Sequence, residues 1–259
     1  MALKELYHPE SGRMRVAGFM SGSGTNLRRI IEHEWKIEAE EGRVPYRVSV
    51  IFSDNPASNA MAIGKEFGIP VFVSNIVDFY KRRGKPMKDM ATRAEYEHDC
   101  MKLLGKFGCD VAAYAGYMRK ATSVFVNSFL GVNVHPADLT VKADNGEPKY
   151  RGDHAVRDAI LAGEKEIRAT THLVSGEVDC GQILMISAPI QVSLPEGFDP
   201  NNGERANFVA SAHQNRLKEV GDWEIFPRTL EFIANGRYSQ DDQGNLYFDG
   251  QPIPNGIRL

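Results

Sequence analysis

Cysteine is scarce in this 259-residue chain, which contains three: Cys100, Cys109 and Cys180. They form no CxxC pair, and no Cys/His group has the spacing of a zinc site. An odd number of isolated cysteines argues against a disulfide framework and against a structural metal. We therefore expect neither, and no metal at the functional site.

Long apolar runs and an excess of positive charge are also missing. No run of about 18 apolar residues occurs, and the first ten residues lack an apolar stretch followed by a cleavage site. Lysine and arginine number 31 against 34 aspartates and glutamates, which gives a net charge of -3. We therefore expect a cytoplasmic protein with no membrane partner and no nucleic-acid partner.

What the sequence does contain is a repeated alternation of strand-like and helix-like segments. Short apolar runs typical of strands cover residues 14–20, 47–52, 69–73, 110–115 and 131–135. Helical spacing follows in a segment beginning at Leu27 and in residues 57–67, 87–107 and 119–127. This order predicts an α/β fold with a Rossmann-like, doubly wound, mostly parallel sheet. Such sheets bind ligands beyond the carboxyl ends of their strands.

The second half of the chain has a looser pattern that favours an antiparallel extension. Strand-like runs cover residues 168–174 and 182–192, and helices are expected over 154–162, 204–220 and 227–234. Residues 238–249 indicate a hairpin that turns at Asp-Gln-Gly. We expect one main domain over residues 1–237 and a C-terminal hairpin and tail over 238–259. The basic run at 81–85 is interpreted as a solvated loop.

The first candidate for chemistry is the glycine loop, residues 21–26, with the sequence Ser-Gly-Ser-Gly-Thr-Asn. A glycine turn before a helix leaves backbone N–H groups free to bind an anion such as phosphate. The loop is no full dinucleotide fingerprint, because Leu27 stands where a third glycine would lie, and no Walker A motif, because Gly-Lys-Ser/Thr is absent. These departures weaken NAD and ATP as ligands. A tight turn that only packs helix on strand is the alternative.

Two further segments carry polar residues at strand ends. Asn133 and His135 alternate on one predicted strand and so share a face, where an amide and an imidazole could stabilise an oxyanion and move a proton. His172 begins a segment that reaches Asp179 in an acidic, glycine-bounded loop. An aspartate near His135 would favour the protonated ring. The alternatives are a structural histidine and a carboxylate that caps a turn.

Together these segments resemble the folate-dependent formyltransferases. The resemblance lies in the glycine loop with Leu27, in residues 115–119 (Ala-Gly-Tyr-Met-Arg), in residues 133–136 (Asn-Val-His-Pro), and in His172 followed by Asp179-Cys-Gly. The pattern is most similar to that of the phosphoribosylglycinamide formyltransferases of purine synthesis, over residues 14–237. It implies transfer of a formyl group from 10-formyltetrahydrofolate, a co-substrate, to the primary amine of a small phosphorylated acceptor, 5'-phosphoribosylglycinamide.

The resemblance also implies roles for single residues. Gly24, Thr25 and Asn26 would contact the phosphate, and Asp222 would contact the same substrate where the family has a glutamate. Asn133, His135 and Asp179 would be the catalytic trio, with Asp179 raising the pKa of His135. The folate pocket would be lined by Arg93, Met118, Arg119, Lys120, Ala121, Asn133 and Glu177.

The chain departs from the family pattern between His135 and Tyr150. This connection is about eight residues longer than usual, so it could reshape the amine pocket. Three alternatives therefore stay open: a hydrolase of 10-formyltetrahydrofolate, which would not need a phosphate loop, a formyltransferase with another amine acceptor, and a non-catalytic folate-binding protein. The oligomeric state is also open, with a homodimer among the expectations.

Overall fold

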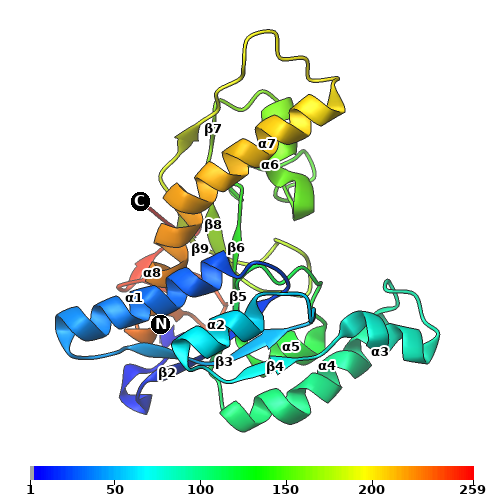
Figure 1. Cartoon of the computed structure of the whole chain (residues 1–259). Coiled ribbons are helices and arrows are strands. Elements are labelled where there is room, and N and C mark those ends of the chain that lie inside the picture. Colours follow the sequence, from blue (N-terminus) through cyan, green and yellow to red (C-terminus); the bar gives the residue numbers. More distant parts are fainter. Residues whose placement is uncertain (1–2) are drawn as a thin grey trace.

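The alternating apolar runs assemble into a central eight-stranded sheet in the computed structural model, which describes residues 3–259 (Figure 1). The strand order is β14-β9-β8-β6-β5-β2-β3-β4. The bounds are β2 Met14–Met20, β3 Tyr46–Ser53, β4 Val71–Val73, β5 Val111–Tyr114, β6 Leu130–His135, β8 Thr170–Leu173, β9 Ile183–Ile186 and β14 Ile257–Arg258.

Strands β2 to β6 are parallel, and the direction changes after β6. β2 pairs with β3 and β5, β3 pairs with β4, and β5 pairs with β6, all in parallel. β8 is antiparallel to both β6 and β9, and β14 runs parallel to β9. The expected mostly parallel sheet with an antiparallel extension in the second half is therefore confirmed.

Two layers of helices cover the two faces of this sheet. One face packs against α1 (Thr25–Glu41), α2 (Ala60–Phe67) and α8 (Trp223–Ala234), and the other against α3 (Ile76–Arg83), α4 (Met90–Leu104) and α5 (Ser123–Ser128). The alternation within β2 explains both cores, because Val16 packs into the first and Phe19 into the second.

A third apolar core lies at the top of Figure 1, where α6 (Ala155–Leu161) packs against α7 (Gly203–Leu217). The short strands β7 (Glu166–Ile167) and β10 (Ile190–Gln191) pair beside these helices. The predicted strand over residues 182–192 is therefore divided into β9 and β10, and only β9 belongs to the central sheet.

One strand near the amino terminus and three strands near the carboxyl terminus form a separate antiparallel sheet. Its strands are β1 (Lys4–Glu5), β11 (Tyr238–Gln240), β12 (Leu246–Phe248) and β13 (Gln251–Pro252), in that order. β11 and β12 form a hairpin, and the chain then returns to the central sheet as β14. The division of the chain at residue 237 stays a prediction.

Two helical predictions need correction at their boundaries. The helix expected from residue 119 begins only at Ser123, because the preceding residues form a loop beyond the carboxyl end of the central strand β5. The helices expected over 204–220 and 227–234 are joined by a π-helical turn, Lys218–Asp222, and α8 already begins at Trp223. Pro227 suggested a helix start there because proline favours the first helical position, whereas it lies inside α8.

The basic run at 81–85 is also partly helical rather than a loop. Its first three residues form the last turn of α3, which ends at Gly84 in the left-handed conformation. Cationic side chains are favourable at the carboxyl end of a helix because they face the negative end of its dipole. The guanidinium of Arg83 also lies 3.5 Å from the ring centroid of Phe79.

Candidate active site

A cleft of about 570 Å³ opens beyond the carboxyl ends of the parallel strands. Its walls are formed mainly by residues from four segments that are far apart in sequence: 21–26, 114–121, 133–136 and 172–179. Three of these segments follow or end β2, β5 and β6, which are neighbours in the sheet. The cleft therefore lies where a doubly wound sheet is expected to bind its ligands.

The glycine loop leads into the amino terminus of α1 at one wall of the cleft. Gly24 has φ +70° and precedes the first residue of the 17-residue helix, and as a glycine it has no side chain with which to cap this end. A Cβ atom at position 24 would lie 2.5 Å from Ile63 Cδ1 and 2.7 Å from Met20 Cε. The loop thus needs glycine for its conformation, and a larger residue would also displace the ends of these two side chains. The loop leaves the first N–H groups of the helix available to an anion.

Asn133, His135 and Asp179 converge on the cleft. Asn133 and His135 both line it, as their alternation on β6 predicted. Asp179 reaches them from the loop after β8, with its backbone at φ +55° and its Oδ2 3.3 Å from His135 Nδ1. The N–H of Gly152 donates to the same oxygen at 2.9 Å. The structure thus joins the three residues that the sequence could not place together.

His172 completes this cluster, although the sequence had assigned it no role. Its Nδ1 lies 2.9 Å from the Leu173 carbonyl, which can only accept, so this nitrogen carries a proton. Its Nε2 lies 3.1 Å from Asn133 Nδ2 and 3.5 Å from Asp179 Oδ1. In the neutral ring Nε2 accepts one N–H of Asn133, and the second N–H of that amide stays available for another acceptor; in the protonated ring Nε2 donates to Asp179 Oδ1 instead.

The electrostatics of His135 differ from the expectation. Burial lowers the pKa of His135 below its ordinary value, and this outweighs the opposing effects of the Asp179 charge and the Tyr150 carbonyl. Asp179 thus acts in the predicted direction, but the prediction of a net rise is wrong because the ring is only 4% exposed. Tyr150 O lies 2.9 Å from Nε2, so both ring nitrogens face acceptor oxygens. An imidazolium here is hydrogen-bonded on both sides, so its Nε2–H must leave the Tyr150 carbonyl before the proton can pass to a ligand in the cleft.

Asp179 itself is ionised. Burial raises the pKa of Asp179. The hydrogen bond with His172, the charge of His135 and the Gly152 N–H outweigh burial, and the pKa is lowered from its ordinary value to about 2. A carboxylate that stays charged can hold the ring of His135 in place through its proton transfers.

Asn26 and Asp222 meet at the opposite wall. The Asn26 amide donates to Asp222 Oδ2 at 3.0 Å. Within the described part of the chain, the buried Oδ1 atoms of both residues have no hydrogen-bond partner. Burial raises the pKa of Asp222 to about 6, which the Asn26 hydrogen bond and the Lys218 charge only partly offset. Two buried acceptor atoms beside the glycine loop are suited to hydroxyl or amine donors of a ligand.

Beside the predicted Asp222 lie two residues that the sequence analysis missed: Gln214 in α7 and Lys218 in the π-helical turn. Gln214, Lys218 and Asp222 all line the cleft and are spaced four residues apart. Counting back from Asp222 in steps of four residues would have predicted Lys218 and Gln214, because residues four apart share a helix face. Lys218 brings a positive charge to the wall that carries the glycine loop.

Four of the predicted folate contacts lie together on the loop 116–121, and a fifth faces them. Met118, Arg119, Lys120 and Ala121 line the cleft, as does Glu177. Lys120 Nζ lies 3.4 Å from Glu177 Oε2, which connects the two loops at the cleft mouth. These loops combine the exposed apolar side chain of Met118 with charged side chains, as a binding site for an aromatic ligand with polar groups requires.

Asn133, a sixth predicted folate contact, also lines the cleft, whereas the seventh, Arg93, lies outside the cleft lining. Its side chain is buried, and its guanidinium donates to the carbonyl of Lys120 at 3.3 Å and to that of Met87 at 3.4 Å. It supports the 116–121 loop from behind, and direct contact with folate stays a prediction.

Beyond Pro136, the long connection after His135 does not line the cleft: among the described residues, 137–151 are absent from its lining. Ala137 and Leu139 are buried, and a bridge between Lys142 and Pro148 closes the segment on itself. This segment affects the site through Tyr150 at its end, because it brings the Tyr150 carbonyl to 2.9 Å from His135 Nε2. The same described residues contain no His/Cys/Asp/Glu group able to hold a metal ion, and no helix long and apolar enough to cross a membrane.

Comparison with known proteins identifies close similarity to one family. A family model described as formyl transferase matches residues 14–193. The phosphoribosylglycinamide formyltransferase of Haemophilus influenzae is 28% identical over 93% of this chain and 96% of that protein. The trifunctional purine biosynthetic protein adenosine-3 of Drosophila melanogaster is 30% identical over 86% of this chain, which spans only 14% of that longer protein.

A solved structure has the same fold. The phosphoribosylglycinamide formyltransferase of Coxiella burnetii superposes with a TM-score of 0.67 at 21% identity, covering 96% of this chain and 100% of that one. At this identity the likeness concerns the fold, and it agrees with the sheet topology described above.

Proposed function

The chain belongs to the formyl transferase family, and from that premise we propose that it transfers the formyl group of 10-formyltetrahydrofolate to the primary amine of 5'-phosphoribosylglycinamide. The relatives that share nearly its whole length carry the name of this activity. The activities of the remaining parts of the trifunctional relatives are not carried over, because the chain spans 14% and 20% of two of them.

The observation that carries the proposal is that Asn133, His135 and Asp179 converge on a cleft that is also lined by the glycine loop at the amino terminus of α1. One wall holds groups for acyl transfer and the other holds a site for a phosphate. A hydrolase of the folate would have no use for the second wall.

The phosphorylated amine is assigned to the glycine loop and the π-helical turn. The N–H groups after Gly24, at the positive end of the α1 dipole, receive the phosphate together with Thr25 and Asn26. The unpartnered Oδ1 atom of Asp222 accepts a hydrogen bond from a hydroxyl group of the same substrate. This position leaves the amine free to extend toward His135.

The formyl donor is assigned to the wall formed by the 116–121 loop and Glu177. Met118 is 58% exposed and offers apolar surface to a flat ring system. When bound, 10-formyltetrahydrofolate supplies the formyl carbon that the amine attacks. The second N–H of Asn133 then stabilises the negative charge that develops on the formyl oxygen, and His135 adds to this when its ring is protonated.

His135 also moves the proton. It gives a proton to the departing folate nitrogen and recovers one from the amine, and Asp179 keeps the ring oriented throughout. The lowered pKa of His135 suits this role, because a weakly held proton is transferred easily. The cleft supplies the rest of the rate by holding two reactants side by side.

A spectrophotometric assay tests the proposal. The purified chain is mixed with 10-formyltetrahydrofolate, with and without 5'-phosphoribosylglycinamide, and tetrahydrofolate formation is followed. We expect turnover only when the ribonucleotide is present. The variant His135→Ala should lose it, whereas His33→Ala is the matched control because His33 pairs with the Glu231 carboxylate at 2.8 Å outside the cleft.

Each of the other outcomes would indicate a different function or acceptor. Turnover without the ribonucleotide would indicate a hydrolase, and turnover only with a different phosphorylated amine would correct the acceptor. Folate binding without turnover on any amine would identify a binding protein. A homodimer stays a prediction, which light scattering of the same preparation would test.

A further inference from the structure

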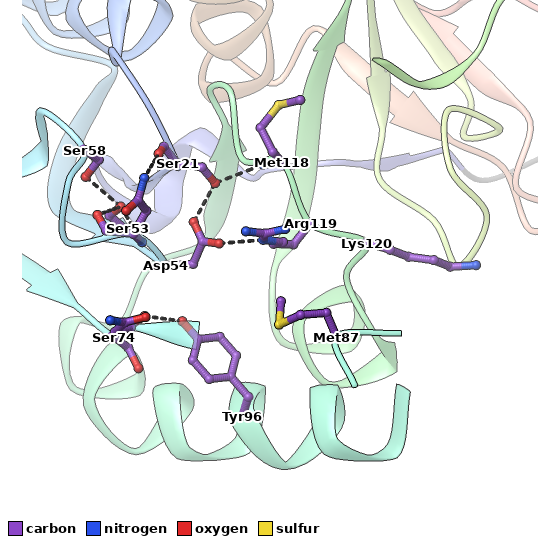
Figure 2. A network of polar contacts seen from close by, with 12 residues as sticks. Ser21, Ser53, Asp54, Ser58, Ser74, Met87, Tyr96, Met118, Arg119 and Lys120 are labelled. Carbon is purple, nitrogen blue, oxygen red and sulfur yellow. Dashed lines mark hydrogen bonds and ion pairs between the residues drawn. The ribbon is translucent and has the colours of Figure 1, made fainter. Parts of the chain in front are cut away.

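Asp54 lies behind the cleft, between the two loops to which the substrates are assigned (Figure 2). It follows β3 directly, its side chain is 1% exposed, and it does not line the cleft. Its Oδ1 accepts from Ser21 Oγ at 2.5 Å, and its Oδ2 accepts from Arg119 Nε at 2.8 Å. One buried carboxylate therefore holds the first residue of the glycine loop and a residue of the 116–121 loop.

Ser21 adds direct bonds between the same two loops. Its Oγ, which donates to Asp54, also accepts from Met118 N at 3.0 Å, and its backbone N–H donates to the Gly116 carbonyl at 3.0 Å. Figure 2 shows the side chains of Ser21, Asp54 and Arg119 pointing toward one another, while Lys120 extends away from them. The network thus has one branch through the serine hydroxyl and one through the guanidinium.

The turn that carries Asp54 is itself fixed in place. Asn55 Nδ2 donates to the Ser21 carbonyl at 2.9 Å, and the hydroxyls of Ser53 and Ser58 are 2.8 Å apart. Hydrogen bonds to a buried carboxylate in such a connected cluster are strong, and breaking one member weakens the others. A displacement of either substrate loop must therefore disturb the other loop or break this network.

We propose that Asp54 is a positioning residue that couples the glycine loop to the 116–121 loop, so that each substrate, by ordering its own loop, prepares the loop for the other. The inference rests on the proposed assignment of the phosphorylated amine to the first loop and of the folate to the second. A ligand that orders one loop also reduces the conformational entropy that the other loop has left to lose. The two substrates therefore bind with positive cooperativity.

Cooperativity of this kind is measurable as a binding factor that is equal in both directions. Isothermal titration gives the affinity of the chain for tetrahydrofolate alone and with saturating 5'-phosphoribosylglycinamide, and then the reverse. We expect each ligand to tighten the other by about 5-fold or more, which is the lower end of typical couplings. In Asp54→Ala the factor should fall toward one in both orders.

Three further variants separate coupling from simple stability. Asp54→Asn can still bond to Ser21 and Arg119, so its coupling factor should recover above that of Asp54→Ala. Glu34→Gln is the matched control, because Glu34 is a buried carboxylate that accepts from Val48 N at 2.9 Å and from Arg47 Nε at 3.1 Å, away from the cleft. Its coupling factor should equal that of the wild type. If Asp54→Ala does not fold, Ser21→Ala replaces it with the same expectation.

The outcomes separate the two proposals. A wild-type chain that binds neither ligand would refute the proposed function. A wild-type chain that binds both ligands without coupling, or an Asp54→Ala variant that keeps the full factor, would overturn the role of Asp54 while the function stands.

Discussion

Asp222→Asn should make the protein more stable and a poorer enzyme at the same time. Asp222 is 4% exposed, one of its oxygens has no hydrogen-bond partner among the described residues, and burial raises its pKa to about 6. The folded protein therefore carries a charge that its surroundings disfavour. An asparagine has nearly the same shape, can still accept the Asn26 hydrogen bond, and carries no charge.

The size of the gain follows from the pKa. The difference between an ordinary value of 3.8 and about 6 corresponds to about 3 kcal/mol, at roughly 1.4 kcal/mol for each pKa unit. Because the folded-state pKa of Asp222 is raised, its favourable contribution is complete below pH 3.8 and is lost as the pH rises through about 6. The advantage of the variant should thus be about 3 kcal/mol at pH 7 and about 1 kcal/mol at pH 4.5.

Urea unfolding at the two pH values measures this advantage, and steady-state kinetics measures its cost. Loss of a charged acceptor should raise KM for the phosphorylated amine by about 10-fold to 100-fold, since hydrogen bonds to charged groups contribute about 1.5–3 kcal/mol. KM for the folate should change little. A variant that is less stable than the wild type at pH 7, or whose advantage does not shrink at pH 4.5, would refute the reasoning.

Three other substitutions test the site. His135→Ala should lower kcat by about 100-fold to 10,000-fold with the folate affinity nearly intact by titration, and unchanged turnover would contradict its role. Asp179→Asn should be about 2 kcal/mol less stable at pH 7, because the pKa of Asp179 is lowered from 3.8 to about 2; urea unfolding should show this difference disappearing as the pH falls through 2. Gly24→Ala should cost about 1–3 kcal/mol through its φ of +70° and raise KM for the phosphorylated amine. Gly22→Ala, where a Cβ meets nothing within 4 Å, is its stability control, and equal unfolding midpoints for the two would count against a strained glycine loop.

Much of the fold was predictable because its signals are local. The buried strands of a parallel sheet are short apolar runs, and the helices between them repeat every three to four residues. The boundaries that failed were decided by non-local packing: the helix expected at residue 119 gives way to the loop that Arg93 and Ser21 hold in place. Pro227 likewise suggested a start that the π-helical turn overrides.

The sequence by itself determined the local features of this protein: the alternation of strand and helix, the glycine loop before a helix, and the shared face of Asn133 and His135 on one strand. These follow from steric rules that act over a few residues. Only the tertiary structure decided that Asp179 reaches His135, that burial lowers the pKa of that histidine, and that Asp54 joins two loops. Burial and charge pairing depend on which segments, distant in sequence, come into contact, and a local sequence pattern does not predict those contacts.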